Sequence, residues 1–318
     1  MGVLGCASIA RRRVLPALDA LPCTEIAAIA SRDPGRAGKL GARYGCRPVH
    51  GYADLLRLPD VDAVYVPLPA ALHAPWVEAA LRAGKHVLAE KPLTTDAEQT
   101  RALVRLAAQR GLVLRENVMF VHHPQHARVR ALLRDGAIGR VHSLHAAFAV
   151  PELPAHDIRY QGELGGGALF DVGIYPLRAA AYFLGDRLTV AGAVLSSTSG
   201  RRVDTGGAAL LSTPEGTAAH LTFGLEHLYR SEYEIRGSHG RITVDRAFTP
   251  AADHHPVVRL ERDSGVREIR LAPHDQVAGA LTAFATAVRS GGGPDEAMVR
   301  MAVLLEEVRH AAHRPAEP

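Results

Sequence analysis

Residues 2–10 read Gly-Val-Leu-Gly-Cys-Ala-Ser-Ile-Ala, a short apolar run, a tight turn that begins at Gly5, and the first residues of a helical pattern. This strand–turn–helix order is typical of a dinucleotide-binding βαβ unit, in which the turn approaches the pyrophosphate. The usual fingerprint has three glycines, but Ala7 and Ala10 replace two of them here. The turn alone does not exclude an ordinary strand-to-helix connection, and its place at the head of a βαβ series favours the cofactor interpretation.

The first 120 residues alternate short apolar runs with helical patterns, which predicts a parallel sheet. Residues 63–66 are apolar throughout, as expected of a strand buried on both faces, and Pro67 and Pro69 then mark a loop at the carboxyl edge of the sheet. Ligands of open α/β sheets bind at that edge. The predicted strands are 2–5, 25–31, 63–68, 86–90 and 113–118, and the predicted helices are 10–19, Pro34–Tyr44, 74–83 and 96–110.

The pattern changes after residue 120. A helix at 124–135, a strand at 141–150 and a helix at 172–184 precede a region, 189–271, of closely spaced strand-like runs. Clustered strands with turns between them predict a mostly antiparallel sheet. We therefore predict an α/β chain with an N-terminal Rossmann domain, 1–120, and a C-terminal α+β domain, 121–318. The clearest strands of the second domain are 208–212, 217–223, 233–236 and 257–261, and its last helices, Gln276–Ser290 and 295–312, can pack back on the first domain.

Composition excludes several classes of protein. The chain has 318 residues, 47% of them hydrophobic and 22% charged, which is ordinary for a globular protein. The net charge of +4 is scattered, and the run at residues 11–13, three arginines, is too short for a nucleic-acid-binding arm. That run is either a solvated helix start or a neighbour of a cofactor phosphate.

The cysteines and the apolar runs indicate the cellular compartment of the protein. Cys6, Cys23 and Cys46 are odd in number and irregular in spacing, which argues against a disulfide framework or a zinc site. No apolar run is long enough to span a bilayer, and no basic segment precedes the first apolar residues. We expect a cytoplasmic protein that binds neither membrane nor nucleic acid.

The second predicted strand ends in Ala-Ser-Arg-Asp at residues 30–33. NAD-binding domains usually place an acidic residue there for the ribose 2′-hydroxyl. Here Ser31 and Arg32 occupy the position, and a guanidinium can hold a 2′-phosphate through two hydrogen bonds. Asp33 is interpreted as the cap of the following helix. The sequence thus predicts NADP(H) rather than NAD(H).

Glu90-Lys91-Pro92 follows the strand predicted at 86–90. Lysine is rare in this chain, since Lys39 and Lys85 are its only other lysines. A lysine at the carboxyl edge of a parallel strand points toward the ligand crevice, where desolvation and a nearby cation lower its pKa. The alternative is a surface lysine paired with Glu90.

Residues 165–167 are three glycines, which allow close backbone approach, and Asp171 and Tyr175 follow them. These two share one face of a helix because they are four residues apart. A tyrosine at the edge of the core is the competing interpretation. The histidines at 122, 123 and 126 fit no zinc spacing, so no metal site is predicted. His73, after the strand predicted at 63–68, is a candidate for the nicotinamide end of the crevice.

Taken together, Glu90-Lys91-Pro92, the stretch from Asp171 to Tyr175, and His73 resemble the glucose–fructose oxidoreductase / inositol dehydrogenase / rhizopine-catabolism (Gfo/Idh/MocA) family. Residues 116–126, 157–160 and 240–248 are most similar to its nucleotide-sugar 3-ketoreductases of deoxysugar biosynthesis. The resemblance implies a large open sheet in the second domain, association through that sheet into a homodimer or homotetramer, and NADPH-dependent reduction of the C3 ketone of a dTDP-linked keto-sugar. Ala7 and Ala10 depart from the family's usual glycine turn.

The resemblance also implies roles for individual residues. Lys91 and Tyr175 are the expected catalytic residues, with Asp171 in support. The expected cofactor-binding residues are Gly5, Cys6, Ala7, Ser8, Ile9, Ser31, Arg32, Pro67, Leu68, His73, Glu90 and Lys91. The candidates for the sugar or nucleotide are Arg159, Tyr160, His227 and Tyr229. Two other functions stay open: a dehydrogenase of free sugars, cyclitols or dihydrodiols, and a non-catalytic cofactor-binding sensor.

Overall fold

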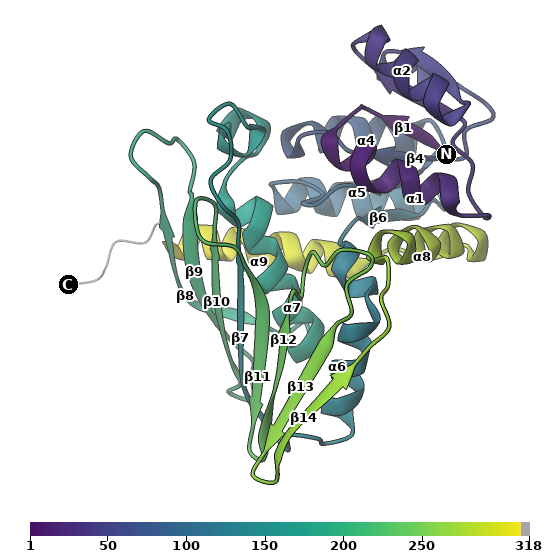
Figure 1. The fold of residues 1–318 in the computed structure, drawn as a ribbon. Helices are drawn as coiled ribbons and strands as arrows, with labels where there is room; N and C mark the ends of the chain where they lie inside the picture. The colour runs from purple at the N-terminus through teal and green to yellow at the C-terminus, as the bar shows by residue number, and fades with distance from the viewer. Residues whose placement is uncertain (313–318) are drawn as a thin grey trace. The chain divides into compact units, whose positions relative to one another are not determined.

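The computed structural model of the protein describes residues 1–312 (Figure 1). It divides into two compact units. Among the described residues, unit 1 comprises Met1–Met119 and Val277–Ala302, and unit 2 comprises Phe120–Gln276 and residues 303–312. Residues 313–318 of the predicted second domain lie outside the described residues.

Within unit 1, six parallel strands form one sheet in the order β3-β2-β1-β4-β5-β6. The chain runs outward from β1 in one direction and then from β4 in the other, so the order reverses between these two central strands. This is the Rossmann arrangement, and the ends of β1 and β4 form its topological switch point. The strands are β1 (Gly2–Leu4), β2 (Ala28–Ser31), β3 (Arg47–His50), β4 (Ala63–Val66), β5 (His86–Ala89) and β6 (Leu114–Glu116).

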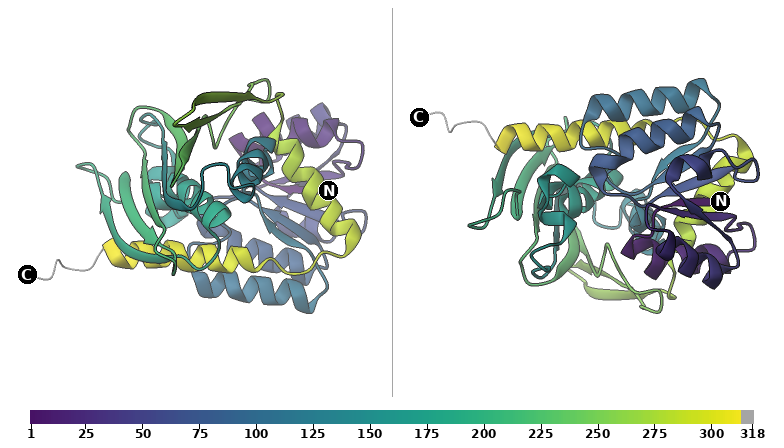
Figure 2. Two further views of the ribbon diagram at one scale, coloured as in Figure 1. Left: turned by 90° about the horizontal axis from the view of Figure 1, so that it is seen from below. Right: turned by 90° about the horizontal axis from the view of Figure 1, so that it is seen from above.

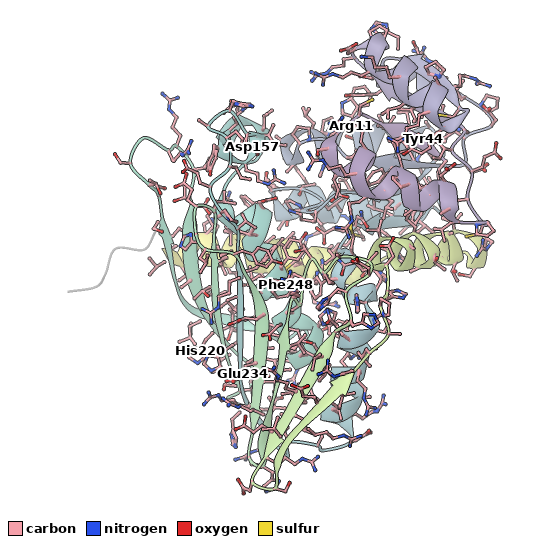
Figure 3. The ribbon with its side chains drawn as sticks, in the orientation of Figure 1. Arg11, Tyr44, Asp157, His220, Glu234 and Phe248 are labelled. Atoms are coloured by element: carbon pink, nitrogen blue, oxygen red, sulfur yellow. The ribbon has the colours of Figure 1, made fainter. Side chains whose placement is uncertain are left out.

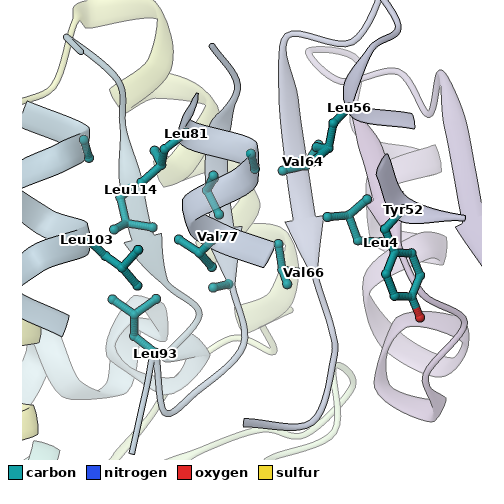
Figure 4. Close-up of a cluster of buried hydrophobic side chains, with 14 of the residues drawn as sticks. Leu4, Tyr52, Leu56, Val64, Val66, Val77, Leu81, Leu93, Leu103 and Leu114 are labelled. Carbon is teal, nitrogen blue, oxygen red and sulfur yellow. The ribbon is translucent and has the colours of Figure 1, made fainter. Parts of the chain in front are cut away.

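Helices cover both faces of this sheet. One face buries Leu4, Val64 and Val66 against Leu81 and Leu103 of the helices (Figure 4), and the opposite face buries Val3 and Tyr65, which lie in a second core cluster. Burial on both faces explains why the central strands β1 and β4 carry no charged residue and are apolar along their length. The helical segments of unit 1 are η1 (Ala10–Val14), α1 (Leu15–Ala20), α2 (Pro34–Tyr44), α3 (Tyr52–Leu56), η2 (Ala70–Leu72), α4 (His73–Arg82) and α5 (Ala97–Gln109), with most of α8 (Gln276–Ser290) and the start of α9 (Glu296–Ala312).

Strand β3 and helix α3 were not predicted from the sequence. β3 is the outermost strand, and most of its residues are exposed, so it lacks the apolar pattern of the inner strands. Its Pro48 is tolerated at this edge position. The predicted strands at 25–31, 63–68 and 113–118 exist but are shorter than expected, since their apolar ends continue into loops.

Unit 2 contains an eight-stranded sheet in the order β14-β13-β12-β11-β7-β10-β9-β8, counted over the described residues. Every neighbouring pair is antiparallel except β7 and β10, which run parallel. The predicted fold class, a Rossmann domain plus an α+β domain with a mostly antiparallel sheet, is therefore confirmed. The strands are β7 (Val141–Ala149), β8 (Thr189–Ser196), β9 (Gly206–Ser212), β10 (Ala218–Gly224), β11 (Arg230–Gly237), β12 (Gly240–Asp245), β13 (Val257–Arg262) and β14 (Gly265–Arg270).

Helix α7 (Ile174–Leu184) lies against one face of this sheet, over β7 and β10 (Figure 2). It continues a π-helical turn, η6 (Leu169–Gly173), so the helix begins three residues earlier than the predicted 172. Gly173 permits the close packing, since a Cβ there would lie 3.1 Å from the ring of Phe223. The other helical segments of unit 2 are η3 (Met119–His122), α6 (Pro124–Arg134), η4 (Ile158–Tyr160) and η5 (Gly162–Leu164), together with the end of α9. Over residues 1–312, no helix combines the length and apolarity that a bilayer crossing requires.

Candidate active site

The turn after β1 has the backbone that a dinucleotide site requires. Gly5 has φ +123°, a conformation that side chains other than hydrogen strain, and its N–H donates to the Ala30 carbonyl at 2.9 Å. A Cβ on Gly5 would lie 3.1 Å from Cδ2 of Leu68, which follows β4. The predicted cofactor residues Gly5 and Leu68 thus meet at the switch point. Cys6, Ala7, Ser8 and Ile9 continue the turn into the helix.

Asp33 caps α2, as predicted. Its carboxylate accepts hydrogen bonds from the N–H groups of Gly35 and Arg36, at 2.9 and 3.2 Å. Ser31 is buried and accepts from the Asp33 N–H at 3.0 Å, whereas Arg32 is exposed. The helix start engages the Asp33 carboxylate, and Arg32 places an exposed positive charge directly at the end of β2.

Two further arginines lie near this strand end. Burial raises the pKa of the Cys6 thiol, while the Ser31 hydroxyl, Arg36 and Arg11 oppose that shift. Arg36 also pairs with Asp33 at 3.3 Å, and both side chains are largely exposed. Arg11, labelled in Figure 3, comes from the run whose proximity to a phosphate was one of two interpretations. Arg36 carries no local signal in the sequence, because it looks like an ordinary residue in the first turn of a helix.

A buried carboxylate lies at the end of β5, directly before Lys91. Glu90 is 8% exposed, and its Oε1 accepts from the Tyr65 hydroxyl at 2.6 Å and from the Asn117 amide at 2.7 Å. Burial, and then the carboxylate beside it, raise the pKa of Tyr65, so the phenol keeps its proton and remains a donor. Tyr65 belongs to β4 and Asn117 follows β6, so residues from two neighbouring strands hold the Glu90 carboxylate in place. Lys91 itself is half-buried, and the Lys91–Pro92 peptide bond is cis.

His73 connects two loops at the carboxyl edge. Its Nδ1 lies 2.8 Å from the Pro92 carbonyl and its Nε2 lies 2.7 Å from the Leu68 carbonyl. Burial lowers the pKa of this ring. A neutral imidazole donates through only one nitrogen, so one of the two carbonyls receives the hydrogen bond at a time. The contact of His73 with a cofactor stays a prediction, and its observed partners are the loops that carry Leu68 and Lys91.

In unit 2, Asp171 and Tyr175 lie on the continuous helix formed by η6 and α7. Asp171 accepts from Nε of Arg159 at 2.7 Å, and Asp157 accepts from Nη1 of the same arginine at 3.1 Å. Asp171, followed by Asp157, raises the pKa of Arg159. Asp171 lies one helical turn before Tyr175, so the two carboxylates hold a permanently charged guanidinium near that turn of the helix.

The glycine-rich stretch serves close backbone packing. A Cβ on Gly166 would lie 2.5 Å from the Arg159 carbonyl oxygen, and Gly167 donates its N–H to that oxygen at 2.9 Å. Asp204 then accepts from the Leu169 N–H at 2.6 Å, at the start of the helix. The glycines thus bind the Arg159 segment to the beginning of the helix that bears Tyr175.

The other candidates for substrate differ in their surroundings. Tyr160 is buried under the guanidinium of Arg201, which lies 3.7 Å from the ring centre. His227 is exposed, with Nδ1 2.7 Å from the Leu225 carbonyl. Tyr229 is 39% exposed and its hydroxyl is 3.3 Å from Oγ1 of Thr249. Among the described residues, no group of three His, Cys, Asp or Glu side chains is arranged to hold a metal ion.

A Rossmann unit with a positive-φ glycine turn, joined to a unit that carries an acid-capable tyrosine, defines the class of two-domain NAD(P)-dependent oxidoreductases. The chain belongs to the GFO/IDH/MocA family. The profile of that oxidoreductase family, which describes an NAD-binding Rossmann fold, matches residues 1–118, and the profile of the GFO/IDH/MocA C-terminal domain matches residues 126–243.

Relatives within the family are similar over nearly the whole chain. The dTDP-3,4-didehydro-2,6-dideoxy-α-D-glucose 3-reductase of Actinomadura kijaniata is 54% identical over 98% of this chain and 95% of its own length. The enzyme of the same name from Streptomyces violaceoruber is 52% identical over the same shares. The crystal structure of a 3-ketoreductase from Actinomadura kijaniata with NADP and TDP-benzene matches with a TM-score of 0.95 and 54% identity, covering 98% of this chain and 96% of that one.

Variants of that 3-ketoreductase have also been crystallised with TDP-benzene and NADP. One replaces a tyrosine by phenylalanine, and two others replace a lysine by alanine or by glutamate. The replaced lysine and tyrosine are separated along that chain by the same number of residues as Lys91 and Tyr175 here. Residue type and spacing thus agree at both positions.

Proposed function

We propose that this chain is an NADPH-dependent 3-ketoreductase that reduces the C3 ketone of a dTDP-linked deoxy-keto-sugar, with dTDP-3,4-didehydro-2,6-dideoxy-α-D-glucose as its substrate. The observation that carries the proposal is the match of Lys91 and Tyr175, in type and spacing, to the two residues replaced in the 54% identical 3-ketoreductase. A non-catalytic sensor would not need to retain both groups.

The residues of unit 1 fit NADP(H). The Gly5 turn and the N–H groups at the start of η1 would hold the pyrophosphate, since a helix start attracts anions. Ser31 and Arg32 would hold the 2′-phosphate. The nicotinamide end would lie along Pro67, Leu68, His73, Glu90 and Lys91. The bound cofactor would supply the hydride.

The chain's own residues would handle the developing negative charge and the proton. As the ketone becomes an alkoxide, Nζ of Lys91 and the phenol of Tyr175 donate hydrogen bonds to its oxygen, and one of the two transfers its proton there. Such a positioned acid contributes roughly 10²–10⁴-fold to the rate. The lysine ammonium further stabilises the alkoxide.

The fixed guanidinium of Arg159, close to Asp171, and the neighbouring Tyr160 would face the sugar or its diphosphate, with His227 and Tyr229 as further candidates. We also propose that the protein is a cytoplasmic homodimer or homotetramer that associates through the eight-stranded sheet. Sedimentation velocity on the purified chain would show a monomer if that assembly does not form.

The rival function is a dehydrogenase of free sugars, cyclitols or dihydrodiols, and dTDP separates the two. A nucleotide-sugar enzyme uses binding energy from the remote diphosphate and base to position the ketone. We expect dTDP to inhibit competitively against the substrate and to raise the melting temperature, and the free keto-sugar to be a poor substrate. No thermal shift and no inhibition at millimolar dTDP would favour the free-sugar dehydrogenase.

A further inference from the structure

Three phenylalanines surround the ring of Tyr175. The ring centres of Phe148, Phe248 and Phe120 lie 4.8, 5.8 and 5.9 Å from that of Tyr175. Phe248 also contacts the other two, with ring centres 5.2 Å from Phe120 and 5.4 Å from Phe148. Phe148 lies in β7 and Phe120 lies in η3, so both rings are held by regular secondary structure in the core of the unit. Phe248 does not come from a strand or helix.

Phe248 belongs to an irregular segment, residues 246–248, that follows β12. The segment begins at Arg246, which has φ 48°, an uncommon value for a residue other than glycine. Ala247 and Phe248 are nevertheless completely buried (Figure 3 labels Phe248). Buried backbone groups outside regular structure require other partners, and here side chains provide most of them.

The partners of Phe248 are Ser231 and Gln276. Its N–H donates to Oγ of Ser231 at 3.0 Å, and its carbonyl accepts from Nε2 of Gln276 at 3.0 Å. Gln276 is 3% exposed, and its Oε1 has no hydrogen-bond partner. A buried glutamine with one unpaired atom is costly for stability alone, which favours a role for the amide that it does satisfy.

The carbonyl of Ala247 accepts from two residues at the start of α6, Nε2 of Gln125 at 3.1 Å and Nε2 of His126 at 3.0 Å. Burial lowers the pKa of His126 to about 3, so the ring is neutral. With its proton on Nε2, its Nδ1 accepts from the Tyr233 hydroxyl at 3.0 Å. Burial raises the pKa of Tyr233, which keeps that proton in place.

We infer that Gln125, His126 and Gln276 are positioning residues for the reaction: they fix the 247–248 segment and, through the ring of Phe248, the orientation of Tyr175. This inference rests on the proposed acid role of Tyr175. It gives the His-His-Pro-Gln-His stretch at 122–126 a function without a metal. A displacement of about 1 Å in a catalytic group can lower turnover as much as 10²-fold.

The test is a double-mutant cycle in the full-length protein with NADPH and dTDP-3,4-didehydro-2,6-dideoxy-α-D-glucose. Gln276→Met removes the hydrogen-bond donor and keeps the side-chain length. We expect it to lower the single-turnover rate about ten- to hundredfold while the Kd for NADPH stays within about twofold. In a Tyr175→Phe background the same substitution should lower the rate by less than about twofold, since coupled residues are not additive.

A matched control separates positioning from stability. Arg262→Met also removes a hydrogen bond from a side chain to a backbone carbonyl in unit 2, to Ala137 at 2.7 Å, but not one on the 247–248 segment. It should lower the Tm without lowering the rate. If Gln276→Met does not fold, Gln125→Met serves instead, because His126 still donates to the Ala247 carbonyl.

The outcomes are distinguishable. An unchanged rate in Gln276→Met, or an equal loss in the Tyr175→Phe background, overturns the positioning role while the proposed function stands. A Tyr175→Phe protein with an unimpaired rate refutes the acid role of the tyrosine, and the positioning role with it.

Discussion

Two glycine-to-alanine substitutions in unit 1 should change stability in opposite directions. At Gly5, with φ +123° and Leu68 Cδ2 3.1 Å from a new Cβ, alanine is strained whether or not Leu68 moves. Backbone strain of this kind costs roughly 1–3 kcal/mol. At Gly38, inside α2, a new Cβ would meet no atom within 4 Å apart from the local helix backbone, and φ is not positive. Alanine there should stabilise unit 1 by about 0.5–1 kcal/mol.

Hydrogen exchange of unit 1 peptides as a function of urea reports the free energy of unfolding of that unit, and NADPH titration reports the cofactor site. We expect Gly5→Ala to unfold at lower urea and to bind NADPH more weakly. Gly38→Ala should unfold at higher urea with unchanged NADPH affinity. Equal shifts for both variants, or a Gly5→Ala protein that binds NADPH normally, would show that the conformation of the turn is not what the cofactor site requires.

Three other perturbations follow from the site. Arg32→Ala should raise the KM for NADPH about ten- to hundredfold and barely change that for NADH, and equal use of both cofactors by the unmodified protein would contradict this. Lys91→Met should lower kcat by about two orders of magnitude while NADPH binding stays intact. Lys91→Arg should not restore kcat, because the donor geometry of a guanidinium differs. A near-normal kcat in Lys91→Met would show that the lysine is structural. Burial lowers the pKa of His126 to about 3 and, together with His274 and His254, that of His123 to about 4. Below pH 6.5 these histidines therefore bind protons in the unfolded chain but not in the folded chain. Unit 2 should lose stability as the pH falls toward 4, by up to about 1.4 kcal/mol per pH unit for each histidine. Equal urea midpoints at pH 7.5 and 5 would contradict that.

The inner strands of both sheets were predictable because burial imposes a simple pattern on them. Residues 63–66 are apolar at every position, and β4 occupies that range. The cap at Asp33 was predictable for a similar local reason, since one side chain satisfies adjacent N–H groups. The edge strand β3 was not, because an exposed strand with a proline carries no such pattern.

The residues of the candidate site also differ in whether a local sequence pattern predicts them. Residues at strand ends and in short motifs, such as Gly5, Lys91 and Tyr175, can be selected from the sequence. Partners brought from distant parts of the chain cannot. No local sequence pattern predicts that Tyr65 and Asn117 bind Glu90, or that Gln276 binds the Phe248 carbonyl. Each of these contacts depends on how separate elements pack.

We propose that the protein delivers hydride from NADPH to C3 of a dTDP-linked keto-sugar. The most direct measurement supplies dTDP-3,4-didehydro-2,6-dideoxy-α-D-glucose and NADPH with deuterium at both C4 positions, and locates the deuterium in the product by NMR. We predict deuterium at C3 of the sugar, and none when Lys91→Met replaces the unmodified protein on the same time scale. Deuterium at C4 of the sugar, or oxidation of free sugars without any turnover of the dTDP-linked ketone, would contradict hydride transfer to C3.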